Sequence, residues 1–429
     1  MDLLTVRFSN VNNNAPRIEE RLYGRKDYVF FDTDNLFPQR MVELADNSPI
    51  HGAAINKHSF FIAGNGIEFE SESDSRADQA LNWLEGVTDG LDKFITALSL
   101  DRAYFTGHCV AVQHTVAGDI LKVKHQDFST VRAGRTLMPD IWESTEYWFS
   151  IDWKKATFKL KWDDQDFVQP KEYVNYFNPK RRKSATAFIY DKGYKPGKLY
   201  YPEPDYLGAL KYVKTEIKLS QYVDRLTTNG FRAGTHIHLF KELDDEAAKK
   251  AETKINDKFA NDEAPDIVLT YGGDPSSAPT VNNLPAFTNA EILTTVGKEL
   301  QKQIDTAHVI PSMLYTSFET STGLDGQATA IREVLEYYQN SGVRPEQKRI
   351  EQTLDTLLAA GGFEDVKTHI KAVNPVNFMV EKDIMMAALE RNEIRKEIGW
   401  PDLEDDRGKV IINNGSNGVQ RQDETGNAD

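Results

Sequence analysis

Two long helical patterns limit the folds that are open to this chain. Residues 205–228 contain no Pro and only one Gly, Gly208, and their apolar residues stay near one stripe. Residues 289–309 carry apolar residues at three- and four-residue spacing, and Pro311 closes this second pattern. We therefore expect two long helices that bracket the segment between them.

The segment between the two helices predicts a small α/β insertion. Asn229 and Gly230 form a left-handed stop signal after the first helix. The elements expected next are a strand at 235–239, a helix from about 244 to 259, and strands at 267–269 and near 281. A chain with this pattern leaves the first helix, builds a compact insertion and returns through the second.

Mixed patterns on both sides of the helix pair predict an α+β fold. Before it, we expect helices after Pro38 and over 81–100, then strands at 109–112 and 121–123 and a meander from 147 to 190. After it, a helix resumes near 331 and is expected to be interrupted at Gly342 and Pro345. One more amphipathic helix is expected over 384–398, followed by a polar tail from Asn413 that we expect to be disordered.

Composition and charge exclude several classes of function. The chain has 429 residues and a formal net charge of −15, so its surface as a whole repels a phosphate backbone. Its single cysteine, Cys109, cannot form an intrachain disulfide. No run of 18 apolar residues and no secretion signal occur, and we expect neither secretion nor a membrane partner.

The familiar motifs of catalysis and nucleotide binding are also missing. The sequence has no G-x-x-x-x-G-K-[ST] loop, no H-E-x-x-H and no G-x-S-x-G. We expect no enzymatic activity, no cofactor and no bound metal. The candidates weighed for a metal or for paired carboxylates are His108, Cys109, His114, His236, His238, Asp163, Asp164 and Asp166, and ordinary packing or solvation is favoured for all of them.

Three short segments occur in a specific order. The first is YPEPDY at 201–206, which leads into the first long helix; the second is AHVIPSML at 307–314, followed by a polar loop and VRPEQ at 343–347. The third is RNEIR at 391–395 with GWP at 399–401. Together they resemble the portal proteins of tailed bacteriophages over roughly residues 30–410.

This resemblance implies an elongated portal fold with wing, two-helix stem, small α/β clip and short helical crown. The implied parts are an arm (1–25), the wing (26–203 and 328–378, the second part a kinked helix), stem helices (204–230 and 291–310), the clip (231–290), a tunnel loop (311–327), and the crown with a disordered tail (379–429). It also implies a homo-oligomeric ring, a dodecamer, at one capsid vertex.

The partners implied are double-stranded DNA held without sequence preference in the channel, a terminase ATPase, the major capsid protein and head–tail adaptor proteins. The implied location is the virion, with assembly in the host bacterial cytoplasm.

Three groups of residues are candidates for these roles. Four cations spaced by 3, 4 and 7, together with a pair on the second helix, form a basic stem face that points to the channel, to a neighbouring subunit or to solvent: Lys211, Lys214, Lys218, Arg225, Lys298 and Lys302. The implied tunnel-loop residues are Leu314, Tyr315, Phe318, Glu319, Thr320, Ser321, Thr322, Gly323, Leu324, Asp325 and Gly326. Candidate partner-docking residues of the clip are Lys241, Glu242, Asp244, Asp245 and Asp274.

Two other functions remain open at this point. A head–tail adaptor, or another structural protein of the virion, is consistent with the acidity and the single cysteine. A metal-dependent enzyme that processes polynucleotides would use the carboxylates and histidines named above.

Overall fold

The structure is a computed structural model that describes residues 18–22, 27–135, 144–157, 168–178, 180–181, 184–228, 232–240, 250, 253, 266–271, 280–285, 290–311, 331, 333–373 and 392. The chain divides into two compact units: Met1–Thr322 with Thr329–Ala372, and Gly323–Ala328 with Val373–Asp429. All described residues except Val373 and Asn392 belong to the first unit.

The first unit begins with a strand pair and two helices. The elements are β1 (Glu20–Leu22), β2 (Val29–Phe31), α1 (Phe37–Asn47) and α2 (Pro49–Ala63). Ser48 separates the two helices and caps the second, because its hydroxyl accepts a hydrogen bond from the His51 amide at 3.2 Å. Gly64 ends α2 at φ 73°, where a Cβ would lie 2.4 Å from the Lys371 carbonyl oxygen.

The next helical region consists of two helices rather than one. They are α3 (Asp74–Val87) and α4 (Leu91–Phe105). The prediction of one helical stretch over 81–100 was therefore wrong in detail, because Gly90 takes a φ of 104° that only glycine adopts easily. The α4 helix packs against α2 and presents Leu98 and Phe94 to the core.

A six-stranded sheet forms the largest β element, in the order β5-β4-β9-β8-β7-β6. Its strands are β4 (Gly107–His114), β5 (Ile120–His125), β6 (Val131–Ala133), β7 (Glu146–Phe149), β8 (Lys171–Asn175) and β9 (Thr186–Lys192). The short η1 (Phe128–Thr130) and α5 (Trp153–Thr157) lie in its connections. The Phe128, Tyr147 and Tyr190 rings stack at 4.8–4.9 Å and fill the core beside the sheet.

The last part of the first unit returns to this core. A π-helical turn, η5 (Gln339–Val343), leads into α10 (Arg344–Ala360), and β13 (Lys367–Ile370) pairs antiparallel with β3 (Ile67–Glu70). The predicted interruption at Gly342 and Pro345 was wrong: helical backbone continues through both. The widened turn accommodates Pro345, which stands in the first turn of α10, where its missing N–H breaks no bond.

A buried ion cluster fixes α10 to the core. Arg102 of α4, whose side chain is 1% exposed, donates hydrogen bonds to Asp191 at 2.6 Å and to Glu346 at 2.5 Å. Beside it, His108 shares a hydrogen bond of 2.8 Å with the Thr353 hydroxyl. Since these residues come from α4, β4, β9 and α10, the cluster joins distant parts of the sequence.

Between these parts of the sequence lie the two long helices and a three-stranded sheet. The elements are η3 (Asp205–Ala209), α6 (Leu210–Thr228), β10 (Arg232–Leu239), β11 (Asp266–Tyr271), β12 (Thr280–Pro285) and α8 (Ala290–Ala307). The central strand β10 pairs parallel with β11 and antiparallel with β12. All three strands predicted for the insertion are present. Of its predicted helix over 244–259, the structure describes only Lys250 and Thr253, and both are helical.

Candidate functional site

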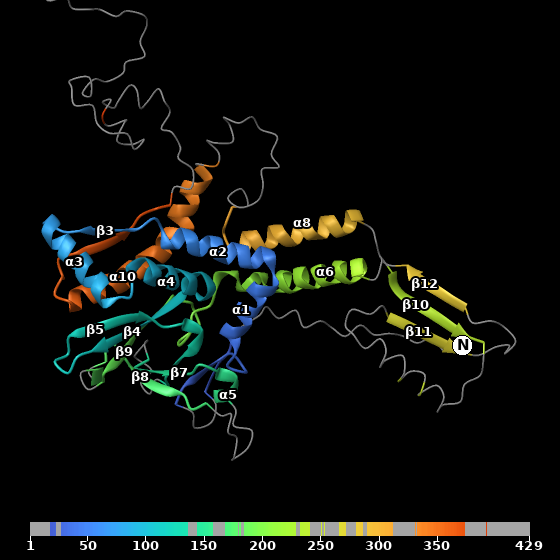
Figure 1. The fold of residues 1–429 in the computed structure, drawn as a ribbon, viewed down its shortest axis with the longest axis horizontal. Coiled ribbons are helices and arrows are strands. Elements are labelled where there is room, and N and C mark those ends of the chain that lie inside the picture. Colours follow the sequence, from blue (N-terminus) through green and yellow to red (C-terminus); the bar gives the residue numbers. More distant parts are fainter. Residues whose placement is uncertain are drawn as a thin grey trace, which may run out of the picture. The chain divides into compact units, whose positions relative to one another are not determined.

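The two long helices lie side by side and run in opposite directions (Figure 1). Tyr206 in η3 stacks on His308, one residue beyond α8, with the ring centroids 4.8 Å apart. The start of the first helix therefore meets the end of the second. The predicted pair of long, adjacent helices is present, and Gly208 lies in the 3-10 turn that precedes α6 rather than inside the α-helix.

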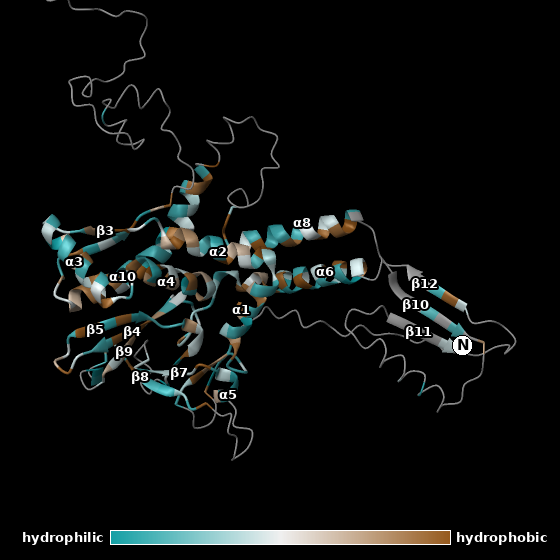
Figure 2. Ribbon diagram, in the orientation of Figure 1, coloured by the Kyte–Doolittle hydropathy of each residue, from teal (hydrophilic) through white to brown (hydrophobic). Residues whose placement is uncertain are grey.

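Most side chains of this pair are exposed in a single copy of the chain. The buried residues of α6 are Leu210, Val213, Glu216 and Leu226. On α8, Leu300 and Ile304 are buried, but Ile292 and Val296 are 46% and 39% exposed. Figure 2 shows hydrophobic and hydrophilic segments alternating along both helices. One apolar stripe of each helix packs against the other helix, and other apolar side chains remain in contact with solvent.

Two histidines and a tyrosine anchor the pair to α2 and α4. His51 Nδ1 and His308 Nε2 are 2.8 Å apart, and the Tyr206 hydroxyl donates to the Tyr104 carbonyl at 2.5 Å. Burial lowers the pKa of His51 to about 4, and burial together with the neighbouring His51 and His58 lowers the pKa of His308 well below its usual value. Both rings are therefore neutral near pH 7, so one donates to the other.

Two carboxylates are buried in the pair with an oxygen that has no hydrogen-bond donor among the described residues. These atoms are Glu216 Oε2 on α6 and Asp305 Oδ1 on α8. Burial raises the pKa of Asp305 to about 6. Groups of this kind lower the stability of an isolated helix pair.

A groove of about 590 Å³ runs between α1 and α6. Its apolar floor includes Phe37, Met41 and Leu210. Two cations of α6, Lys214 and Lys218, line the same groove. The groove thus lies along a face of α6 and combines an apolar floor with positive charge.

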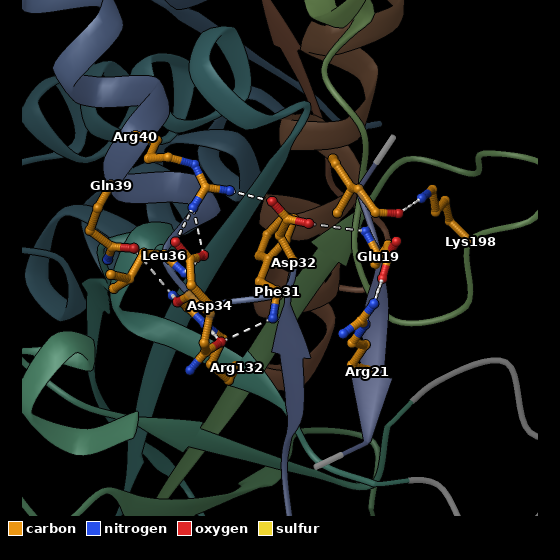
Figure 3. Close-up of polar contacts among 12 residues, drawn as sticks. Glu19, Arg21, Phe31, Asp32, Asp34, Leu36, Gln39, Arg40, Arg132 and Lys198 are labelled. Carbon is orange, nitrogen blue, oxygen red and sulfur yellow. Dashed lines mark hydrogen bonds and ion pairs between the residues drawn. The ribbon is translucent and has the colours of Figure 1, made fainter. Parts of the chain in front are cut away.

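Ion pairs connect the residues on the α1 side of the groove. Arg40 bridges Asp32 and Asp34, with 2.5 Å from Arg40 Nη1 to Asp34 Oδ1 (Figure 3). Burial acts against ionisation of Asp34, but the hydrogen bond and charge of Arg40 bring its pKa below the ordinary value. Arg40 is neutralised in this way, and Glu43 of α1 lines the groove with a negative charge, so the positive charge in the groove comes from the two lysines of α6.

The structure gives the predicted basic residues separate surroundings. All six are exposed, and the four on α6 share one face, as their spacing predicts. Lys214 and Lys218 lie in the groove, whereas Lys211 approaches the Tyr212 ring at 4.8 Å from its centroid. On α8, Lys298 and Lys302 stand one turn apart, away from the buried Leu300 and Ile304.

The two other groups of candidate residues lie outside the described residues. None of the predicted tunnel-loop residues from 314 to 326 and none of the candidate clip residues from 241 to 274 is described. The described residues next to the loop are Pro311 and Ile331. Just before it, Val309 has a φ of 57°, which is unusual for a β-branched residue.

The histidines weighed as metal ligands have other contacts. His108 contacts Arg102 and Thr353, while His114 stacks on Tyr176 at 6.0 Å. His236 and His238 share a strand face as expected, and both hydrogen-bond to the Thr270 hydroxyl, at 2.8 and 2.6 Å. No group of three or more potential metal ligands occurs in the part of the chain that the structure describes.

Sequence reasoning missed the groove and the exposed apolar side chains of α8. The sequence carries apolar residues at three- and four-residue spacing over 289–309, which predicts a helix without dividing these residues into rows. Helical spacing places them in two rows and separates 292, 296, 299 and 303 from 293, 297, 300 and 304. The polar residues Glu299 and Gln303 that continue the first row were a usable signal. Nothing in the sequence places α1 beside α6, because more than 160 residues separate the two helices.

Comparison with known proteins identifies the fold. No protein-family model and no curated protein matches the sequence. The structure resembles a chain from the neck of an empty gene transfer agent (GTA) particle, with 13% sequence identity, coverage of 85% of this chain and 95% of that chain, and a TM-score of 0.52. It also matches an HK97-family phage portal protein from Corynebacterium diphtheriae, with 11% identity, coverage of 77% and 95%, and a TM-score of 0.41.

These likenesses extend over most of the chain. No helix among the described residues is long and apolar enough to cross a lipid bilayer. The chain has the fold of the particle-neck protein, in a match that covers 85% of this chain and 95% of that chain.

Proposed function

We propose that this chain is the subunit of a portal ring at one vertex of a phage-like capsid. The ring would form the channel for genome packaging and ejection, and the docking site for a terminase ATPase, the major capsid protein and head–tail adaptor proteins. The particle-neck fold supports this proposal, and the neck containing that fold is described with sixfold symmetry, which a twelve-subunit ring contains.

The observation that carries the proposal is the exposed antiparallel helix pair. Each helix uses one stripe for its partner and leaves apolar side chains exposed beside it, including Val223, Ile292 and Val296. A helix pair that leaves apolar side chains exposed on both of its helices is suited to lateral contact with further copies of itself. Repeated by rotation, such pairs form the wall of a central hole.

The α8 helix has a face suited to a DNA channel. Helical spacing puts five exposed residues on the side away from Leu300 and Ile304: Glu291, Thr295, Lys298, Lys302 and Thr306. We assign this face to the channel. It is polar, and its two lysines per subunit are accompanied by an acidic residue, so it would guide a duplex without binding it tightly.

The remaining parts are assigned by the portal resemblance. In this proposal residues 26–203 and 328–378 form the wing, 204–230 and 291–310 the stem, 231–290 the clip, 311–327 the tunnel loop and 379–429 the crown. The terminase would dock on the clip, and the assembled ring would reside in the virion.

Electron microscopy of the purified chain tests the proposal directly. End-on views are expected to show rings of twelve subunits with a central hole wide enough for duplex DNA. A chain that stays monomeric at high concentration would contradict it. Metal-dependent nuclease activity of the purified protein would instead favour the enzymatic alternative.

A further inference from the structure

We infer that the α1–α6 groove of one copy receives a row of α8 residues from the next copy, and that this contact joins neighbouring subunits. The row is formed by Ile292, Val296, Glu299 and Gln303. This inference rests on the proposed function, because it names the surfaces through which the ring would close.

The groove has the composition of a receptor site for a helix. Its floor is apolar, and Ile217 of α6 is half-buried among the lining residues. Lys214 and Lys218 line the groove from α6, each exposed and on the same helix face, while Glu43 lines it from α1, so the positive charge is confined to the α6 side. An occupant should therefore offer apolar side chains followed by a negative charge.

The α8 row has this composition. Ile292 and Val296 are 46% and 39% exposed, and Glu299 follows them at helical spacing. Gln303 donates a hydrogen bond to Glu299 at 2.7 Å, which holds the carboxylate on this row. The row lies beside the stripe that faces α6, so both sets of residues can be engaged at once.

The groove and the α8 row lie at matching heights along the helix pair. Subunits related by pure rotation have equal heights along the ring axis, so surfaces that meet must lie at equal heights. Tyr206 and His308 stack and define a common level. With a rise of about 2.0 Å per residue in the 3-10 turn and about 1.5 Å per residue in α6, Lys214 lies roughly 14 Å and Ile217 roughly 18 Å above Tyr206.

The α8 row has nearly the same heights, measured from His308. Glu299 lies roughly 14 Å above that level and Val296 roughly 18 Å above it. Glu299 would therefore face Lys214, with Lys218 close by, while Val296 would face Ile217. The charged residues and the apolar residues are thus matched in the same order along both surfaces.

The two surfaces also satisfy the requirement of a closed ring. A heterologous contact joins two different faces of one chain, and only such contacts build rings of many subunits. The groove lies on the α1 side of α6, whereas the row belongs to α8. Each copy can therefore offer its row to one neighbour and its groove to the other.

Cysteine crosslinking tests the contact. Two single variants, Ile217→Cys and Val296→Cys, are mixed and oxidised, and a covalent dimer containing one of each is expected. The double variant is expected to give a ladder of multimers on a denaturing gel. Cys109 is fully buried and stays unreactive. Replacing Val296→Cys by Glu291→Cys, on another face of α8, is the matched control and should give no mixed dimer.

Charge reversal gives a second test. Glu299→Lys is expected to raise the subunit concentration needed for half-assembly roughly tenfold, and Lys214→Glu in the same chain to restore most of the loss. Glu291→Lys makes the same change of charge outside the row and should leave assembly near the wild-type value. Sedimentation velocity over a concentration series measures all three.

The possible outcomes separate this inference from the proposed function. Rings that form without the mixed dimer, and that Glu299→Lys leaves intact, would overturn the contact but not the portal proposal. A wild-type chain that never assembles would overturn both. Ile18 also lines the groove, so a mixed dimer that appears only after removal of residues 2–16 would assign the groove to that segment and overturn the inference.

Discussion

At the scale of residues, the helix pair depends on buried groups that are kept uncharged. His51 and His308 form a hydrogen-bonded neutral pair under the helices, and Tyr206 stacks on it. An unfolded chain exposes both imidazoles to water, where they bind protons at their usual pKa of about 6.5. The stability of the folded chain therefore depends on pH, because the unfolded chain binds protons at these histidines that the folded chain does not bind.

We expect acid to weaken the fold through this pair. The pKa of His51 is lowered to about 4, so the unfolded state binds a proton first as the pH falls. The stability associated with the neutral ring is full above about pH 6.5 and is lost between pH 6.5 and 4, by up to about 3 kcal/mol for one histidine. Urea unfolding of wild type and His51→Asn at several pH values measures this.

The comparison between the two proteins isolates the histidine. The pKa of Asp305 is raised to about 6, so protonation of this residue stabilises the folded state as the pH falls through 6. In the wild type this gain opposes the loss of stability caused by His51. It is present in both proteins, so the difference in their free energies of unfolding removes most of its contribution. That difference should shrink from pH 7 to 4.5, and a constant difference would show that His51 is not the titrating group.

At the scale of elements, the end of α8 contains local strain. Val309 adopts a left-handed backbone with φ 57°, although its side chain is 53% exposed and gains little from packing. For a residue with a branched Cβ this conformation costs about 1–2 kcal/mol. The strain stands between the helix and the segment assigned to the tunnel loop.

Replacing Val309 by glycine should therefore not destabilise the chain. We expect Val309→Gly to leave the free energy of unfolding unchanged or to raise it by up to about 1 kcal/mol. The matched control is Val223→Gly, the same substitution at an exposed position inside α6, which should cost about 1 kcal/mol. Chemical denaturation compares the two, and equal losses in both variants would argue against strain at Val309.

Much of the element content could be predicted from periodicity, but its burial could not. The two long helices, three strands of the insertion and strands such as β4 follow from local spacing. The division of α8 into a buried row and an exposed row was missed, because it depends on which neighbour is present. Likewise Pro345 was interpreted as a break, whereas tertiary packing around Tyr338, which contacts His58, supports a π-helical turn there.

At the scale of the whole molecule, net charge and assembly act together. Twelve copies of a chain with formal charge −15 carry −180, although salt screens each charge beyond roughly 8 Å. A ring of such chains would adhere weakly to DNA, which suits a conduit better than a clamp. Movement of the genome would then be limited by the narrowest ring of residues, which the portal resemblance assigns to the loop after Pro311.

Deletion of residues 320–326 should separate assembly from passage of DNA. We expect rings to form normally, since the helix pair is intact, while particles package or retain their genome poorly. Electron microscopy measures the rings, and quantification of DNA in purified particles measures retention. Replacement of the same segment by Gly and Ser at equal length is the control for spacing. Normal retention in the deletion variant would remove the loop assignment.

The pairing of β3 with β13 has a consequence for synthesis. Ile67 pairs with Ile370 in this ladder, and Arg102 forms an ion pair with Glu346. The core contacts of the first third of the chain are therefore complete only after residues near position 370 have been synthesised. Until translation reaches α10, the surfaces that this helix covers remain exposed to solvent. A prematurely terminated polypeptide would lack α10 and β13 and would keep these surfaces exposed. Quality-control proteases would then degrade it before it entered an assembling ring.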